Sequence, residues 1–177
     1  MSFSGLEQVG LYTIGSQVSN LTTQLSTALN LAWQPWLFRQ LKDGTPRAQR
    51  RVVIAFYVAS AATLGAGFAL WFAAVWLFPY IVGNKYLPTL RFMPWLCLGF
   101  AFRGVASYLS GMVVYSGDTK VLTRIAVAVG VTNVLAAVVL VRHDGAAGAS
   151  QAMCLAYFLN VIVMWYKARQ LVKLPGL

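Results

Sequence analysis

The sequence predicts an all-α integral membrane protein, a single transmembrane domain over residues 1–177. Three observations predict it. Hydrophobic residues make up 59% of the chain and charged residues only 10%; several apolar runs are long enough to cross a hydrocarbon core of about 30 Å; and the basic residues cluster at the ends of these runs. The five expected spans are residues 10–34, 52–78, 92–115, 121–141 and 149–166.

The first expected span carries a stripe of uncharged polar side chains. They recur at steps of three and four, which places them on one face of a helix. The stripe consists of Thr13, Ser16, Asn20, Thr23, Thr27, Asn30 and Gln34. Hydrocarbon cannot satisfy such groups, so the stripe must face protein or a water-filled cavity. Two interpretations stay open: hydrogen-bonded packing between helices, or the wall of a substrate pathway.

Pro35, between Trp33 and Trp36, predicts that this span ends at a membrane interface. Proline disfavours continuation of a helix, and tryptophan prefers the headgroup level. The following segment, residues 39–51, holds five basic residues against Asp43 and is expected to be a cytoplasmic loop.

The second span, residues 52–78, has no charge, and its Ala61 and Gly65 are spaced for close helix approach. The two prolines and Gly83-Asn84 in residues 79–91 predict a turn before the third span.

Gly117-Asp118 predicts the turn between the third and fourth spans. The two glycines in residues 142–148, Gly145 and Gly148, predict a loop before the fifth span. That span leads into a basic tail.

The basic residues also predict the orientation, because excess lysine and arginine in short loops stays in the cytoplasm. With the first connector inside, ten bases are cytoplasmic and three are external, and Arg103 lies within a span. The N-terminus is therefore expected outside and the C-terminus in the cytoplasm. An odd number of spans that starts outside indicates part of a longer transporter.

Catalysis is not expected from this chain. Its carboxylates, Glu7, Asp43, Asp118 and Asp144, all fall in predicted connectors, and His143 is the sole histidine. Without a paired nucleophile or a second histidine we expect no catalytic residues, no metal site and no cofactor. The net charge of +10 comes from bases at the ends of apolar runs, not from one soluble face. Nucleic acid is therefore not an expected partner.

Several short motifs follow one another along the chain. They are Val9-Gly10-Leu11-Tyr12, Asn30-Leu31-Ala32-Trp33-Gln34-Pro35, Gly83-Asn84-Lys85-Tyr86 with Pro88, Asn133, and Gly145-Ala146-Ala147-Gly148-Ala149. In this order they resemble the Wzx-type oligosaccharide and polysaccharide flippases of the multidrug/oligosaccharidyl-lipid/polysaccharide exporter superfamily. The resemblance covers nearly the whole chain but only the C-terminal half of a member of about twelve helices.

The resemblance implies a transport function in the bacterial cytoplasmic (inner) membrane. Members move a lipid-diphosphate-linked oligosaccharide, such as an O-antigen repeat unit of lipopolysaccharide or an exopolysaccharide repeat unit. The implied partners are this substrate, the lipid bilayer, other polysaccharide-assembly membrane proteins and a missing N-terminal half; the chain is then expected to be a fragment. The alternative is a truncated membrane protein that transports nothing, or a half that pairs with a separately encoded N-terminal half.

Arg103 is the only charge near the middle of a predicted span. A central arginine costs about 2.5–3.5 kcal/mol to insert, and no predicted span offers a carboxylate to pair with it. One hypothesis is that Arg103 faces the cavity and binds the diphosphate of the lipid carrier. The other is that it pairs with groups from an absent half, or extends to the interface. The candidate substrate-pathway residues are Arg103, Ser16, Asn20, Thr23, Thr27, Asn30 and Gln34.

Overall fold

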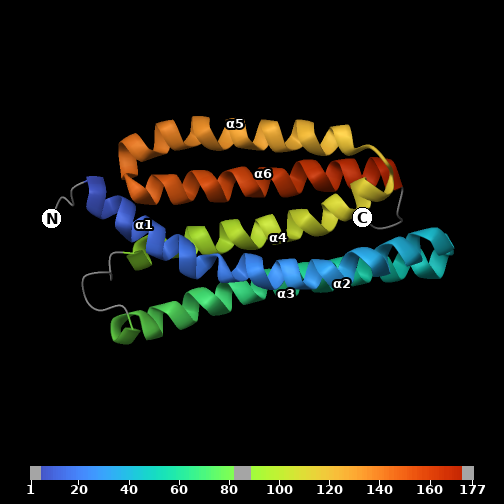
Figure 1. Cartoon of the computed structure of the whole chain (residues 1–177), viewed down its shortest axis with the longest axis horizontal. Coiled ribbons are helices and arrows are strands. Elements are labelled where there is room, and N and C mark those ends of the chain that lie inside the picture. The colour runs from blue at the N-terminus through green and yellow to red at the C-terminus, as the bar shows by residue number, and fades with distance from the viewer. Residues whose placement is uncertain (1–4, 82–88, 173–177) are drawn as a thin grey trace.

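Six α-helices and no strand make up residues 5–81 and 89–172, the part of the chain that the computed structural model describes. The helices are α1 (Gly5–Ser19), α2 (Leu21–Asp43), α3 (Pro46–Ile81), α4 (Met93–Tyr115), α5 (Thr119–Asp144) and α6 (Ala146–Val172). From α2 onward, each helix runs back along its predecessor, so that the long helices form an up-and-down bundle (Figure 1). The predicted all-α architecture is confirmed.

Four of the described helices are long and apolar enough to cross a membrane, over Pro46–Leu77 of α3, Met93–Tyr115, Thr119–Asp144 and Ala146–Val172. The chain therefore has the helices of a multi-pass membrane protein. α1 and α2 follow each other in one direction and together run the length of the bundle (Figure 1). They cover the first of the five predicted spans, but neither of them is among the four described helices that are long and apolar enough to cross a membrane.

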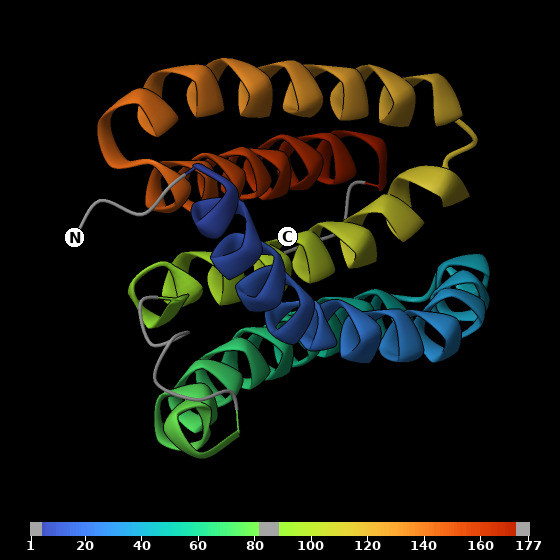
Figure 2. The ribbon, with the colours of Figure 1, turned by 60° about the vertical axis from the view of Figure 1, so that its left-hand side comes forward.

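The prediction of one helix over residues 10–34 is wrong at both of its ends and at Asn20. Helix α1 begins at Gly5, and α2 runs through Pro35 to Asp43. The two are separated by the single residue Asn20, and α1 is tilted from the axis of α2 (Figure 2). Both backbone groups of Asn20 keep a hydrogen bond at the break. The Asn20 N–H donates to the Ser16 carbonyl (2.9 Å), and the Asn20 carbonyl accepts from the Thr23 N–H (2.9 Å).

Pro35 does not end the helix, contrary to the sequence prediction. A proline removes one intrahelical hydrogen bond, and in membrane helices neighbouring groups satisfy the freed carbonyl. Residues 39–51 are accordingly not a loop: only Gly44 and Thr45 separate α2 from α3. Gly44 has φ 62°, the left-handed conformation that glycine favours after a helix. Thr45 accepts a hydrogen bond from the Ala48 N–H (3.2 Å) at the start of α3.

The connections around α5 are equally short. The turn at Gly117-Asp118 is confirmed, with Gly117 at φ 81°. The loop predicted over residues 142–148 is wrong, because only Gly145 (φ 58°) lies between α5 and α6. Helix α3 extends to Ile81, and the predicted Gly83-Asn84 turn lies outside the described residues. The observed helices therefore extend beyond the predicted spans at most ends.

Helix α4 is the centre of the bundle. It contacts all five other helices, and 14 of its 23 residues are buried. Trp33 and Tyr108 pack edge to face, and the Trp33 Nε1–H donates to the Tyr108 carbonyl (3.3 Å). The Tyr108 hydroxyl pairs with Thr63 Oγ1 at 2.9 Å. Helices α2, α3 and α4 are thus joined by hydrogen bonds within the apolar core.

Glycines of α3 and α4 allow the closest helix approaches. A Cβ at Gly67 of α3 would lie 3.2 Å from the Ala101 Cβ of α4, and one at Gly99 would lie 3.3 Å from the Cys154 Cα of α6. Such small-residue contacts let helix backbones pack tightly in lipid. The predicted contact surface at Ala61 and Gly65 is wrong, since both residues are exposed and a Cβ at Gly65 would meet nothing within 4 Å.

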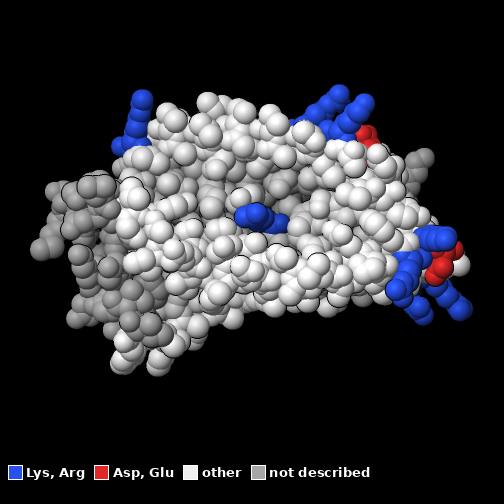
Figure 3. Space-filling view, viewed as in Figure 1, with Lys and Arg blue, Asp and Glu red and all other residues white. Residues whose placement is uncertain are grey.

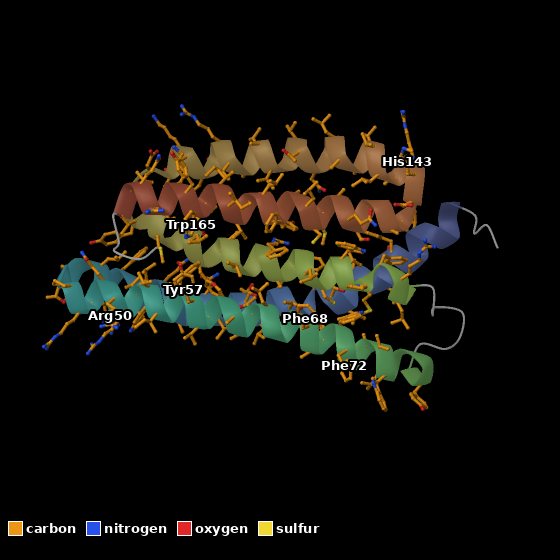
Figure 4. The ribbon with its side chains drawn as sticks, turned by 180° about the vertical axis from the view of Figure 1, so that it is seen from behind. Arg50, Tyr57, Phe68, Phe72, His143 and Trp165 are labelled. Carbon is orange, nitrogen blue, oxygen red and sulfur yellow. The ribbon has the colours of Figure 1, made fainter. Side chains whose placement is uncertain are left out.

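The outer faces of the bundle are apolar. Helix α5 buries only Ile125 and packs mainly on α6. Tyr57, Phe68 and Phe72 project from the outer face of α3 (Figure 4), and all three are exposed. Large apolar side chains that a soluble protein would bury are suited to contact with lipid.

Basic residues are concentrated at one end of the bundle. Of the described lysines and arginines, nine belong to the end where α2 meets α3, α5 begins and α6 ends: Arg39, Lys42, Arg47, Arg50, Arg51, Lys120, Arg124, Lys167 and Arg169. Only Arg91 and Arg142 belong to the opposite end. Figure 3 shows this unequal distribution on one face.

Candidate functional site

A polar groove of about 310 Å³ opens between α2 and α4. Its lining consists of hydroxyl, amide and guanidinium side chains with one leucine and one glycine: Thr23, Ser26, Thr27, Asn30, Leu31, Gln34, Arg103, Gly104, Ser107 and Ser110. Figure 3 shows basic atoms beside a hollow in the middle of this face, away from the basic end. A groove lined by hydroxyl and amide groups is unusual midway along an apolar bundle, because hydrocarbon there could not satisfy these groups.

Helical periodicity produces this lining from two separate sequence patterns. Thr23, Thr27, Asn30 and Gln34 share one face of α2, and Arg103, Ser107 and Ser110 share one face of α4. Gly104 brings the two faces together, because a side chain there would collide with Ser26 of α2 and Thr63 of α3. The groove therefore exists where the absence of a side chain allows two polar faces to meet.

Hydrogen bonds hold the floor of the groove. Asn30 Nδ2 donates to Ser107 Oγ, which links α2 to α4. Ser107 Oγ donates to the Gly104 carbonyl (2.6 Å), and Ser110 Oγ donates to the Ser107 carbonyl (2.7 Å). These contacts fix the rotamers of the two serines and of the asparagine.

Two buried polar atoms of the lining have no hydrogen-bond partner within the described structure. They are Thr23 Oγ1 and Asn30 Oδ1. A buried oxygen without a partner costs about 1–3 kcal/mol, so a polar occupant of the groove that donates to these oxygens would be stabilised. The amide of Asn30 thus has one role in packing through its Nδ2 atom, while its buried Oδ1 atom has no partner among the described residues.

Arg103 stands at the middle of α4 with an exposed side chain. Its guanidinium carbon lies 5.9 Å from the centre of the Tyr157 ring of α6, a cation–π distance. The described carboxylates, Asp43, Asp118 and Asp144, belong to helix ends, so none of them neutralises it. The planar guanidinium therefore keeps its donors available for an anion in the groove.

The structure brings together most of the residues that the sequence analysis selected. Arg103, Thr23, Thr27, Asn30 and Gln34 line one groove. The other two candidates do not belong to the lining: Ser16 is on α1, and Asn20 is the residue between α1 and α2.

Sequence analysis missed Ser26 and Tyr157 as members of this site. Ser26 lies three residues after Thr23, so helical spacing gave a signal for it. Tyr157 had no such signal, because its position under Arg103 depends on the packing of α6 against α4. Among the described residues, no group of three histidine, cysteine, aspartate or glutamate side chains is arranged to hold a metal ion.

The chain matches no family model, no curated protein and no solved structure. The resemblance to flippases stays a prediction, and the geometry of the groove is the basis for the function proposed next.

Proposed function

We propose that the chain is a membrane transport component for a lipid-diphosphate-linked oligosaccharide, such as an O-antigen or exopolysaccharide repeat unit. The α2–α4 groove would form part of the path of the polar head of this substrate across the bacterial cytoplasmic membrane. The observation that carries the proposal is the polar groove with exposed Arg103 at the middle of an otherwise apolar bundle.

The chemistry of the lining supports this substrate class. A guanidinium binds phosphate oxygens through two parallel charge-assisted hydrogen bonds, and Arg103 has no carboxylate among the described residues to occupy it. Thr23, Thr27 and Gln34 offer hydroxyl and amide groups that suit sugar hydroxyls. Hydrocarbon would satisfy neither set of groups, so the groove favours water or a polar ligand.

The alternative is a chain that transports nothing by itself, either a truncated membrane protein or a half that pairs with a separate N-terminal half. The exposure of Arg103 favours a pairing, because a second bundle could cover the groove and supply a carboxylate. Copurification of one membrane protein with the wild-type chain, lost on Arg103→Ala substitution, would support this alternative.

Arg103→Ala is expected to weaken binding of a polyprenyl-diphosphate oligosaccharide to the purified chain by about 10-fold to 100-fold, the range for lost hydrogen bonds to a charged group. Arg103→Lys should have an intermediate effect, because it keeps the charge but loses the planar fork. Arg124→Ala, which removes an exposed charge from α5, is the matched control.

In cells that encode the chain, Arg103→Ala should also reduce polysaccharide export. Normal export at normal protein levels would show that Arg103 does not bind the substrate.

The charge distribution supports an orientation with the basic end in the cytoplasm and the N-terminus outside. Reporter domains fused after Lys42, in the last turn of α2, and after Lys173 are both expected to report a cytoplasmic position. A fusion after Arg142, at the other end of α5, provides the external control. A periplasmic signal from either of the first two positions would contradict this topology.

A further inference from the structure

A second groove, of about 400 Å³, lies between α2 and α3. Its lining is Leu29, Ala32, Trp33, Trp36, Ala55, Val58, Ala59, Ala62 and Tyr108. The residues that α2 contributes fall on a different face from Thr27, Asn30 and Gln34, so the apolar groove and the polar groove flank the same helix on different sides.

The polar atoms within this lining are already satisfied. The Trp33 Nε1–H donates to the Tyr108 carbonyl (3.3 Å), and the Tyr108 hydroxyl pairs with Thr63 Oγ1 (2.9 Å). The wall formed by α3 consists of three alanines and a valine. The groove therefore offers carbon surface without a free hydrogen-bonding group in its floor, which suits a hydrocarbon chain and not a polar ligand.

The apolar groove leads toward the most basic segment of the chain. Arg39 follows Trp36 by three residues on α2, and Arg51 precedes Ala55 by four residues on α3. At these spacings each arginine lies on the same face of its helix as the lining residue, one turn closer to the α2–α3 turn. Both arginines are exposed. Lys42, Arg47 and Arg50 add to the positive charge of this end against Asp43, and Figure 4 shows Arg50 projecting from it.

We infer that the α2–α3 groove binds one anionic phospholipid, with an acyl chain along the alanine wall and the headgroup phosphate at Arg39 and Arg51. Charge complementarity selects this occupant: an apolar slot that ends beside several bases matches a lipid with a hydrocarbon tail and a net negative head. Trp36 lies between the two regions of the site, at the position that an indole ring takes near the headgroup level. This inference is independent of the proposed transport function.

The test is a lipid titration of the detergent-purified full chain, with bound lipid counted by native mass spectrometry. Dioleoylphosphatidylglycerol is the anionic probe and dioleoylphosphatidylcholine the zwitterionic one. The Arg39→Gln/Arg51→Gln variant is expected to bind phosphatidylglycerol about 30-fold more weakly, since each base near a membrane surface contributes about a fivefold attraction. Its control is Lys120→Gln/Arg124→Gln, which removes two charges from the same end of the bundle at α5.

A second variant tests the groove itself. In the Ala62→Trp variant, the indole ring would fill the α2–α3 groove. The control is Ala126→Trp, which places the same side chain on the exposed surface of α5. We expect Ala62→Trp to lose the phosphatidylglycerol molecule and Ala126→Trp to keep it.

Three results would overturn the inference. Equal binding of the two lipids by the wild type would exclude selection by charge. Weakening by the arginine variant without weakening by Ala62→Trp would indicate surface attraction and no groove site. Retention of the lipid by both variants at wild-type affinity would exclude the site altogether.

Discussion

Replacing Gly148 with alanine is expected to lower the free energy of unfolding by about 3 kcal/mol, the upper end of the usual range for overpacked sites. A Cβ at this position would collide with the Leu140 carbonyl group and lie 2.8 Å from the Val141 nitrogen, all backbone atoms of α5. A backbone atom cannot rotate aside as a flexible side chain can. The turn at Gly145 would have to open, and α5 would separate from α6, the helix on which it mainly packs.

Equilibrium unfolding in mixed micelles with increasing sodium dodecyl sulfate measures this effect. Gly130→Ala is the matched control on α5, because a Cβ there would meet nothing within 4 Å. It should unfold at the same detergent fraction as the wild type or at a slightly higher one, since alanine favours a helix over glycine. Identical unfolding midpoints for Gly148→Ala and Gly130→Ala would show that α5 and α6 do not approach as described.

Gly104→Ala is expected to destabilise the bundle by about 2 kcal/mol, again through overpacking. Its Cβ would collide with Ser26 Oγ and lie 2.9 Å from both Ser26 Cβ and Thr63 Cγ2. The side chains of serine and threonine are short and, for threonine, stiff at χ1, so relief requires movement of α2 or α3 away from α4. Because Gly104 also lines the polar groove, the substitution should change the groove as well as the stability.

Two measurements separate these effects. Unfolding in mixed micelles gives the loss of stability, with Gly65→Ala as the control, because Gly65 lies on an exposed face of α3 with open space around it. Crosslinking of cysteines placed at Gln34 and Ser110, which lie at the same level of the groove, reports the separation of α2 and α4. Wild-type crosslinking efficiency in the Gly104→Ala protein would contradict the expected movement.

The polar half of the site could be predicted from the sequence because charge and hydrogen bonding act strongly in an apolar environment. Arg103 and the stripe on α2 stand out for this reason, and the structure places Arg103 with Thr23, Thr27, Asn30 and Gln34 in one groove. The pairing of α2 with α4 could not be predicted. It depends on Gly104, and a glycine in a sequence does not reveal which neighbouring helix it admits.

The ends of the helices were predicted less well than their presence. Pro35 and the basic residues after it indicated an exit and a loop, yet α2 continues to Asp43. Proline, tryptophan and basic residues indicate that a segment lies at the level of the lipid headgroups. A helix can pass through the headgroup region without ending there. Gly44, Thr45 and Pro46 carry the actual boundary signals: a left-handed glycine, a capping threonine and a proline in the first turn.

The contact face of α3 was also misassigned, for a different physical reason. Ala61 and Gly65 have the spacing of a packing motif, but the contact with α4 uses Gly67. Helix α3 is apolar around most of its circumference between residues 52 and 78. Lipid is as apolar as a neighbouring helix, so hydrophobicity alone does not decide which side of such a helix faces protein.

The exposure of α5 has a consequence for the bilayer in which the bundle resides. This helix buries only Ile125, and its uncharged stretch runs from Ile125 to Val141 between Arg124 and Arg142. At 1.5 Å per residue, this stretch is about 26 Å long, slightly shorter than a typical hydrocarbon core. A bilayer of lipids with long acyl chains would have to become thinner beside α5, whereas a bilayer of lipids with shorter acyl chains would match the length of this stretch. In a thicker bilayer, Arg124 and Arg142 would have to extend their side chains outward to reach the headgroups.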